Sequence, residues 1–325
     1  MKPPGSNAGP KVVALGGGHG LYASLSALRN VTDRLTAIVT VADDGGSSGR
    51  LRRELGVLPP GDLRMALAAL CGDDEWGQTW RDVVQHRFRS EGDLQGHAVG
   101  NLLIVALWEL LGGADAPAST VTGLDWVGRL LGAHGRVLPM AAVPMDIVAE
   151  VRGADPSRPD EITQVKGQVA CARTPGGVLG VSLVPADPPA CPEALAAVDD
   201  ADWIVFGPGS WFTSVLPHLK VPALARALTT ARARRVVALN LAPQPGETDD
   251  FSPQTHLEVL QAHAPDLRID VVLADRGVVD DPAALDKAVQ ALGGRLVLAD
   301  VAADDGSPRH EPARLAQAFV QIFDD

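Results

Sequence analysis

The sequence predicts a Rossmann-like α/β fold, in which helices cover both faces of a doubly wound, mostly parallel sheet to make three layers. Short buried apolar runs alternate with helical patterns, and glycine-rich turns follow several of these runs. Of the 325 residues, 46% are hydrophobic, which is enough for a large core. We expect one domain over residues 11–323, with a β-rich insertion at about 136–184 and a disordered leader at 1–10.

The first unit is a buried strand, a glycine turn and a helix. Residues 12–15 are apolar and run directly into Gly16-Gly17-Gly18-His19-Gly20, after which residues 21–28 have a helical pattern. A second buried strand is expected at 35–41. This order is typical of the opening of a parallel α/β sheet.

The middle of the chain is mainly helical and then changes character. Helices are expected at 50–55, 62–70, 77–87, 98–111 and 121–133. From residue 136 to 184, short β-rich segments are separated by polar turns, which indicates a few antiparallel strands. The alternation then resumes, with strands expected at 203–206, 235–241, 269–274 and 295–301 and helices at 253–263, 282–292 and 311–323.

Composition excludes several classes of protein. A net charge of −12 argues against a nucleic-acid or membrane-surface role, because both need clustered positive charge. Cys71, Cys171 and Cys191 have no Cys-x-x-Cys spacing, which argues against a disulfide framework or a structural zinc site. The longest apolar run, 102–111, is too short to span a bilayer, and the N-terminus has no secretory pattern. We therefore expect a cytoplasmic protein.

The first glycine loop leaves three interpretations open. Residues 18–23 match the G-x-G-x-x-A fingerprint of dinucleotide-binding proteins, and Asp43 follows at about the spacing of its ribose-binding acid. The loop can bind a nucleotide or phosphate, can be an NAD site, or can be a purely structural turn. Because it follows a strand, it lies at the sheet edge where open α/β sheets bind ligands.

The loop after the second strand opens with two adjacent carboxylates, Asp43 and Asp44. They precede a Gly/Ser tract, and this combination suits a divalent cation or the hydroxyls of a sugar. An Asx-turn with a serine cap on the next helix is the structural alternative. Asp62 is a helix N-cap candidate, and His97 opens another helix as a proton carrier or a structural residue.

Two later loops also follow predicted strands. Residues 207–214 (GPGSWFTS) offer hydroxyls and backbone N–H groups for a phosphate, and residues 246–249 (GETD) add acidic and hydroxyl groups. No Gly-x-Ser-x-Gly elbow, His-Glu-x-x-His motif or Walker lysine occurs in the sequence. Serine hydrolases, zincins and P-loop proteins are therefore excluded.

Taken together and in order, these tracts resemble the gluconeogenesis factor family, the YvcK type of the CofD-like superfamily. The tracts are GGGHGL at 16–21, TAIVTVADDGGSSGRLR at 36–52, PPGD at 59–62, GHAVGNLL at 96–103, GPGSWFTS at 207–214 and GETD at 246–249. The resemblance covers nearly all of residues 11–323, and the 36–52 tract is its most specific part.

The resemblance implies a cytoplasmic protein that binds a UDP-sugar, with UDP-N-acetylglucosamine as the leading ligand. It also implies a regulatory role in cell shape and cell-wall precursor supply on gluconeogenic carbon sources, a homodimer and a regulatory protein partner. The alternative is the other branch, a metal-dependent 2-phospho-L-lactate transferase of deazaflavin coenzyme synthesis. That branch carries Asn-Thr-Gly-Asp-Asp where this chain has Thr-Val-Ala-Asp-Asp at 40–44, which favours the regulatory branch. No catalytic residue is assigned.

The combined hypothesis gives each candidate residue a role. The diphosphate is held at Gly16, Gly17, Gly18, Gly20, Gly207, Gly209, Ser210, Thr213 and Ser214. Hydroxyls or a Mg²⁺ ion are bound at Asp43 and Asp44 with Gly45, Gly46 and Ser47, and Asp62 and Asn101 orient that loop. The sugar or base is contacted by Glu247, Thr248, Phe251 and Arg309. The chain departs from the family pattern at His19, Met65, Asp250 and Phe251; the last lacks the hydroxyl of the usual tyrosine and retains only stacking.

Overall fold

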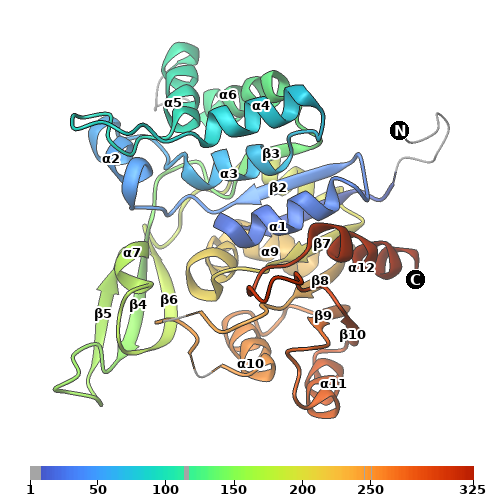
Figure 1. Cartoon of the computed structure of the whole chain (residues 1–325). Helices are drawn as coiled ribbons and strands as arrows, with labels where there is room; N and C mark the ends of the chain where they lie inside the picture. Colours follow the sequence, from blue (N-terminus) through green and yellow to red (C-terminus); the bar gives the residue numbers. More distant parts are fainter. Residues whose placement is uncertain (1–8, 113–116, 245, 250) are drawn as a thin grey trace.

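A seven-stranded parallel sheet forms the centre of the computed structural model, which describes residues 9–112, 117–244, 246–249 and 251–325 (Figure 1). Residues 1–8 of the expected leader and Asp250 lie outside this range. The strand order is β10-β9-β8-β7-β1-β2-β3, and every neighbouring pair is parallel. The strands are β1 (Val12–Gly16), β2 (Leu35–Val39), β3 (Arg136–Pro139), β7 (Trp203–Phe206), β8 (Arg234–Ala238), β9 (Val271–Asp275) and β10 (Arg295–Ala299).

Helices cover both faces of the sheet, which explains why β1, β7 and β9 are buried along their whole length. On one face, α1 (Gly18–Leu28) packs between α3 (Gly61–Ala69) and α12 (Pro312–Asp324). On the other, α8 (Pro192–Asp199) packs against α9 (Pro222–Thr230). The helices α10 (Pro253–His263) and α11 (Pro282–Ala291) follow β8 and β9. The Rossmann-like, doubly wound fold is thus confirmed.

A further helical layer lies outside α3. It consists of α4 (Glu75–Gln85), α5 (Val99–Leu111) and α6 (Pro117–Leu131), at the top of Figure 1. Asp74 caps α4 by accepting a hydrogen bond from the Gly77 N–H (2.8 Å). Within the described part of the chain, none of the helices combines the length and apolar character needed to cross a membrane.

Several helices begin earlier than the sequence pattern predicts, and two of them begin at glycines with positive φ. α1 begins at Gly18 rather than at residue 21, and α2 (Gly46–Leu55) begins at Gly46 rather than at residue 50. Glycine is a poor residue for a helix interior, but both glycines stand at the start of the helix with positive φ (+55° and +46°). Much of the Gly/Ser tract is therefore the first turn of α2 and not an extended loop.

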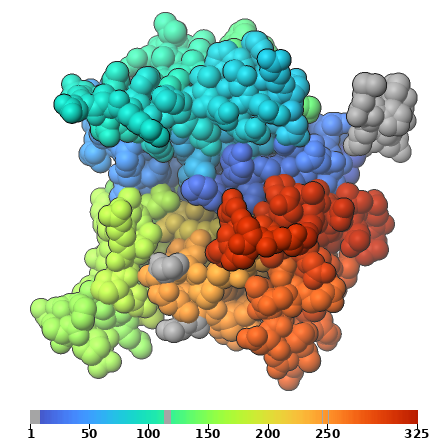
Figure 2. All heavy atoms as spheres, in the orientation of Figure 1, coloured from blue at the N-terminus to red at the C-terminus, as the bar shows by residue number. Residues whose placement is uncertain are grey.

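The insertion is a three-stranded antiparallel sheet with the order β5-β4-β6, which forms a lobe beside the main body (Figures 1 and 2). Its elements are β4 (Asp146–Arg152), β5 (Ile162–Lys166), α7 (Gln168–Cys171) and β6 (Gly177–Val184). The expectation that antiparallel strands start at 136 is wrong, because β3 pairs in parallel with β2. Its buried Val137 and Leu138 complete the core at that end of the main sheet.

The chain leaves β1 toward β2 but leaves β7 toward β8, in the opposite direction across the sheet. Because β1 and β7 are neighbours, the strand order reverses between them. Such a reversal is a topological switch point, where the carboxyl ends of the strands leave a crevice for ligands.

Candidate functional site

The loops that follow β1 and β7 touch each other at the switch point. A Cβ on Gly20 would lie 2.1 Å from Pro208 O and 2.4 Å from Gly209 Cα, so no larger side chain fits there. After β8, Asn240 Oδ1 accepts from the Gly209 N–H (2.7 Å) while its Nδ2 donates to Gly209 O (2.9 Å). The loops after three neighbouring strands thus form one continuous wall. The sequence reasoning missed Asn240, although a polar residue directly after a buried strand is a signal for it.

A cavity of about 780 Å³ opens beside this wall. Its volume is in the range of about 300–1,000 Å³ that small-molecule sites occupy. Residues from four separate parts of the chain line it: His19, Gly20, Tyr22, Ala23, Pro208, Gly209, 240–244, 303–305 and 308–312. Of the predicted site residues, Gly20, Gly209 and Arg309 are among them.

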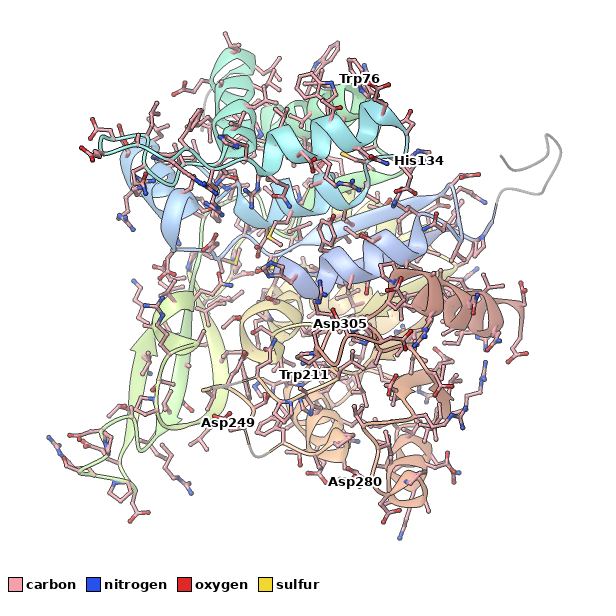
Figure 3. The ribbon with its side chains drawn as sticks, in the orientation of Figure 1. Trp76, His134, Trp211, Asp249, Asp280 and Asp305 are labelled. Carbon is pink, nitrogen blue, oxygen red and sulfur yellow. The ribbon has the colours of Figure 1, made fainter. Side chains whose placement is uncertain are left out.

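The loop between β10 and α12 closes one side of the cavity. Asp275, at the end of β9, fixes it by accepting from the N–H groups of Val301 (2.7 Å) and Ala302 (2.9 Å). Burial lowers the pKa of His310 to about 4, so this imidazole is neutral at physiological pH. Arg309 is exposed on the rim, where it pairs with Asp305 (2.5 Å), labelled in Figure 3. Its guanidinium is held within its own loop but faces solvent.

A carboxylate pair lies on the other side of the first glycine loop. Asp43 Oδ1 accepts from the Gly45 N–H (2.9 Å), which is the Asx-turn of the structural alternative. Asp43 Oδ2 faces the start of α3, because a Cβ on Gly61 would lie 2.8 Å from it. Burial raises the pKa of Asp43. Asp43 therefore lies at the start of α3, close enough for its charge to act on Asp62.

Asp62 belongs to the first glycine loop as much as to α3. A Cβ on Gly17 would lie 2.6 Å from Asp62 Oδ2, and the Gly18 N–H donates to the Asp62 carboxylate. Burial, helped by the negative charge of Asp43, raises the pKa of Asp62 to about 7. Asp62 Oδ2 is buried without a hydrogen-bond partner among the described residues. This carboxyl oxygen is available to a ligand.

The Asp44 carboxylate has different neighbours. Its Oδ1 accepts from the Val169 N–H (3.0 Å) of α7, and its Oδ2 lies against Gly167, the N-cap of that helix. Residues 9–112, 117–244, 246–249 and 251–325 contain no group of three or more His, Cys, Asp or Glu side chains placed to hold a metal. Mg²⁺ often takes only one or two carboxylates and completes its shell with phosphate oxygens and water. Asp43 with Asp62 fits that donor set better than Asp43 with Asp44.

The first turn of α2 is bound to the start of α5. Ser47 Oγ accepts from Asn101 Nδ2 (3.0 Å) and the Ala98 N–H (3.3 Å), and it bonds to His97 Nδ1 (3.0 Å). All four groups are buried, and burial lowers the pKa of His97. These contacts support the structural interpretation of His97. Ser47 and Asn101 shape the loop from behind.

The loop after β7 turns into a short helical turn, η1 (Trp211–Val215), at whose start Glu247 sits. Glu247 accepts from Ser210 Oγ (2.6 and 2.8 Å) and from the Phe212 N–H (2.7 Å). Thr248 Oγ1 likewise accepts from the Gln244 N–H (2.8 Å). Both side chains are buried and already hydrogen-bonded: Glu247 fixes the loop after β8 to the loop after β7, and Thr248 braces its own loop.

The remaining predicted residues lie around these contacts. Thr213 bonds to Ser210, and Ser214 lies close to Gly17, with a Cβ on that glycine 3.3 Å from Ser214 Oγ. Phe251 packs edge-on against Phe212, with ring centroids 5.9 Å apart. Trp211, labelled in Figure 3, is fully buried beside them. Gly16 ends β1, Gly207 directly follows β7, and Gly46 begins α2. The structure thus brings all of the predicted loops to one sheet edge.

Arg64 is a residue that the sequence reasoning passed over. It follows Asp62 on α3 and is only 4% exposed, yet its Nε and Nη1 have no hydrogen-bond partner among the described residues. Burial lowers its pKa to about 10, so it stays charged, and its charge lowers the pKa values of Asp43 and Asp62. Thr40 Oγ1 and Asn101 Oδ1 are also buried without partners in that part of the chain. Such a concentration of unpaired buried atoms is unusual and marks a place for water or ligand.

A switch point with touching glycine loops, a cavity and two half-buried carboxylates defines a Rossmann-like α/β protein with its candidate site at the carboxyl edge of the sheet. The family model "2-phospho-L-lactate transferase CofD" matches residues 12–305, and the chain therefore belongs to the CofD family.

Curated relatives and a solved structure extend this assignment. The chain is 50% identical over 322 residues to a Mycobacterium leprae protein named "Putative gluconeogenesis factor" (98% of this chain, 87% of the relative). It is 35% identical to the "Gluconeogenesis factor" of Listeria monocytogenes (97% and 96%). The crystal structure of a UPF0052 family member from Bacillus halodurans superposes with a TM-score of 0.84 at 31% identity, covering 97% of this chain and 100% of that one. The resemblance stated from the motifs is confirmed.

Proposed function

We propose that this protein is a cytoplasmic regulatory protein that binds a UDP-sugar, UDP-N-acetylglucosamine, and affects cell shape and cell-wall precursor supply on gluconeogenic carbon sources. The observation that carries the proposal is the cavity of about 780 Å³ at the switch point, directly beside the contact of Gly20 with Pro208 and Gly209. The names of the relatives support the regulatory part. A homodimer and a protein partner belong to the same proposal.

The start of α1 suits the diphosphate. The N-cap residue Gly17 has no side chain to cap the helix. The Gly18 N–H donates to Asp62, but the following N–H groups of the first turn can bind an anion, and the helix dipole favours negative charge there. The nucleoside then occupies the cavity, and the sugar lies toward Asp43 and Asp62. If Mg²⁺ accompanies the ligand, these two carboxylates hold it, and the ion neutralises the charge of the diphosphate.

The alternative is a 2-phospho-L-lactate transferase, which the description of the family model names. It is not favoured, because the curated relatives cited above are named gluconeogenesis factors. The sequence at 40–42 also departs from the transferase tract. The two functions differ in their ligands, and a titration separates them.

The test is calorimetry of the purified protein with UDP-N-acetylglucosamine, UDP, GDP and NAD, each with and without Mg²⁺. We expect saturable binding of the UDP-sugar, recovery of the ligand intact, and a stability gain of roughly 2.7 kcal/mol at 100 times Kd. Binding of GDP with no binding of UDP-N-acetylglucosamine would support the transferase, and binding of NAD alone would refute both.

A variant pair localises the binding. Asn240→Asp replaces the amide that donates to Gly209 O by a carboxylate that repels it, and we expect at least tenfold weaker UDP-sugar binding. Asn30→Asp makes the same change just beyond the far end of α1, where the Asn30 side chain donates to Ser26 O (2.8 Å), and it should leave affinity unchanged. Equal affinity of both variants would place the ligand elsewhere.

A further inference from the structure

The short helix α7 lies between two loops of the candidate site. At its first turn, the Val169 N–H donates to Asp44 Oδ1 (3.0 Å). Val169 also packs closely on Gly45, where a Cβ would lie 2.8 Å from Val169 Cγ2. Gly167 has φ +102°, and a Cβ there would lie 2.3 Å from Asp44 Oδ2. The loop after β2 is therefore fastened to the antiparallel sheet by a hydrogen bond and by two close glycine contacts.

The other end of α7 meets the loop after β8. Gly246 has φ +78°, and a Cβ on it would lie 3.1 Å from Ala172 O and 3.5 Å from Thr174 O. The next residue, Glu247, is bound to Ser210 and the Phe212 N–H of the loop after β7. Through these contacts α7 reaches the loops of three strands of the parallel sheet.

An ion-pair triad makes a second connection between the same parts. Asp146, the first residue of β4, pairs with Arg52 of α2 (2.7 Å) and with Lys166, the last residue of β5 (3.0 Å). The Asp146 side chain is only 25% exposed, so solvent screens these pairs less than an open surface pair. Because α2 starts directly after Gly45, the triad joins the antiparallel sheet to the same loop as Asp44 does.

We propose that the antiparallel sheet responds to ligand binding. Asp44 acts as a positioning residue that ties α7 to the loop after β2. Binding of the UDP-sugar and attachment of the sheet to this loop therefore stabilise one another. This inference rests on the proposed function. Linkage makes the effect reciprocal, and couplings of roughly 5- to 150-fold in affinity are typical. Among the described strands, β5 pairs only with β4, and its other edge is open (Figure 1). Amide hydrogen exchange at β5 should therefore show whether ligand binding stabilises the antiparallel sheet.

The experiment is hydrogen exchange of the full-length protein with and without saturating UDP-N-acetylglucosamine, read by mass spectrometry. In the wild type, we expect the ligand to slow exchange of 167–171 and of β5 at least fivefold. Asp44→Ala removes the acceptor for the Val169 N–H, and it should abolish this slowing and weaken affinity at least fivefold. Asp44→Asn keeps an oxygen acceptor without the charge, and it should behave as the wild type.

Asp155→Ala is the matched control. Asp155 lies in the turn between β4 and β5, where its carboxylate accepts from the Ser157 N–H (2.9 Å) and hydroxyl (2.7 Å). Its replacement by alanine should leave the ligand response unchanged. Unchanged exchange in β4–β6 while the wild type binds ligand would overturn the proposal. So would a failure of Asp44→Asn equal to that of Asp44→Ala, since the charge would then act on the ligand directly. Absence of any calorimetric binding by the wild type would instead overturn the proposed function, and the ligand coupling with it.

Discussion

Gly20→Ala tests the contact that joins the two glycine loops. The added Cβ would lie 2.1 Å from Pro208 O and 2.4 Å from Gly209 Cα, whereas Cβ atoms essentially never come nearer than 3.0 Å to another heavy atom. The obstacle is backbone, so the loops must separate by nearly an ångström. Overpacking of this kind costs about 1–3 kcal/mol. We expect a loss of unfolding free energy of that size together with the loss of UDP-sugar binding.

Urea unfolding and calorimetry measure the two effects, and Gly128→Ala is the matched control. Gly128 is an interior residue of α6 with room for a methyl group, because the nearest atom to its Cβ would be Leu67 Cδ2 at 3.8 Å. Its replacement should raise stability by about 0.5–1 kcal/mol through helix propensity. If Gly20→Ala kept both its midpoint and its affinity, the loops could not be in the contact described.

Three further outcomes are expected. The pKa of Asp62 is raised to about 7 by burial and by Asp43, so the folded state binds its proton more tightly than the unfolded chain, and stability falls as pH rises from about 4 to 7. Asp62→Asn should remove that decline in a pH series of urea midpoints without ligand; a parallel decline in the variant would refute the assignment. Burial opposes ionisation of Asp146, but its hydrogen bonds and ion pairs with Lys166 and Arg52 lower its pKa in the folded state. Asp146 therefore adds to the free energy of unfolding above its unfolded pKa, and this contribution is lost as pH falls through the folded pKa. Asp146→Asn should therefore destabilise at neutral pH but hardly in strong acid, and an equal loss at both would contradict the pairing. The buried guanidinium of Arg235 donates to four carbonyl oxygens in and just after the end of α9. Arg235→Lys should lower the free energy of unfolding by about 2–3 kcal/mol, and an unchanged urea midpoint would contradict this role.

The strands of the parallel sheet were predictable because they are mostly buried, and a short apolar run that ends in glycine is typical of a strand covered on both faces. The helix starts at Gly18 and Gly46 were not, since propensity counts glycine against a helix wherever it stands. At a first turn the N–H groups lack intrahelical partners, and tertiary contacts decide where the helix begins. β3 was misassigned for a related reason: a short apolar run does not reveal which sheet it joins.

The candidate site was predictable as a set of loops but not as a set of contacts. Parallel topology brings the carboxyl ends of strands together, so the motif tracts were expected at one edge. Their side-chain directions depend on neighbours that are distant in the chain. Asp43 lies beside Asp62 and not with Asp44, because Val169, 125 residues further on, engages Asp44. Arg64 was overlooked because nothing local distinguishes it from an ordinary surface residue, whereas Asn240 was overlooked although it stands directly after a buried strand.

The cavity brings together segments that lie far apart in the chain. His19 and Gly20 form one wall, residues 303–312 form another, and Figure 2 shows the C-terminal segment (red) lying against the N-terminal residues (blue). During synthesis, the cavity is therefore incomplete until residues 303–312 have emerged. Any ligand that binds there can stabilise only molecules in which this late segment has already packed against the N-terminal loop.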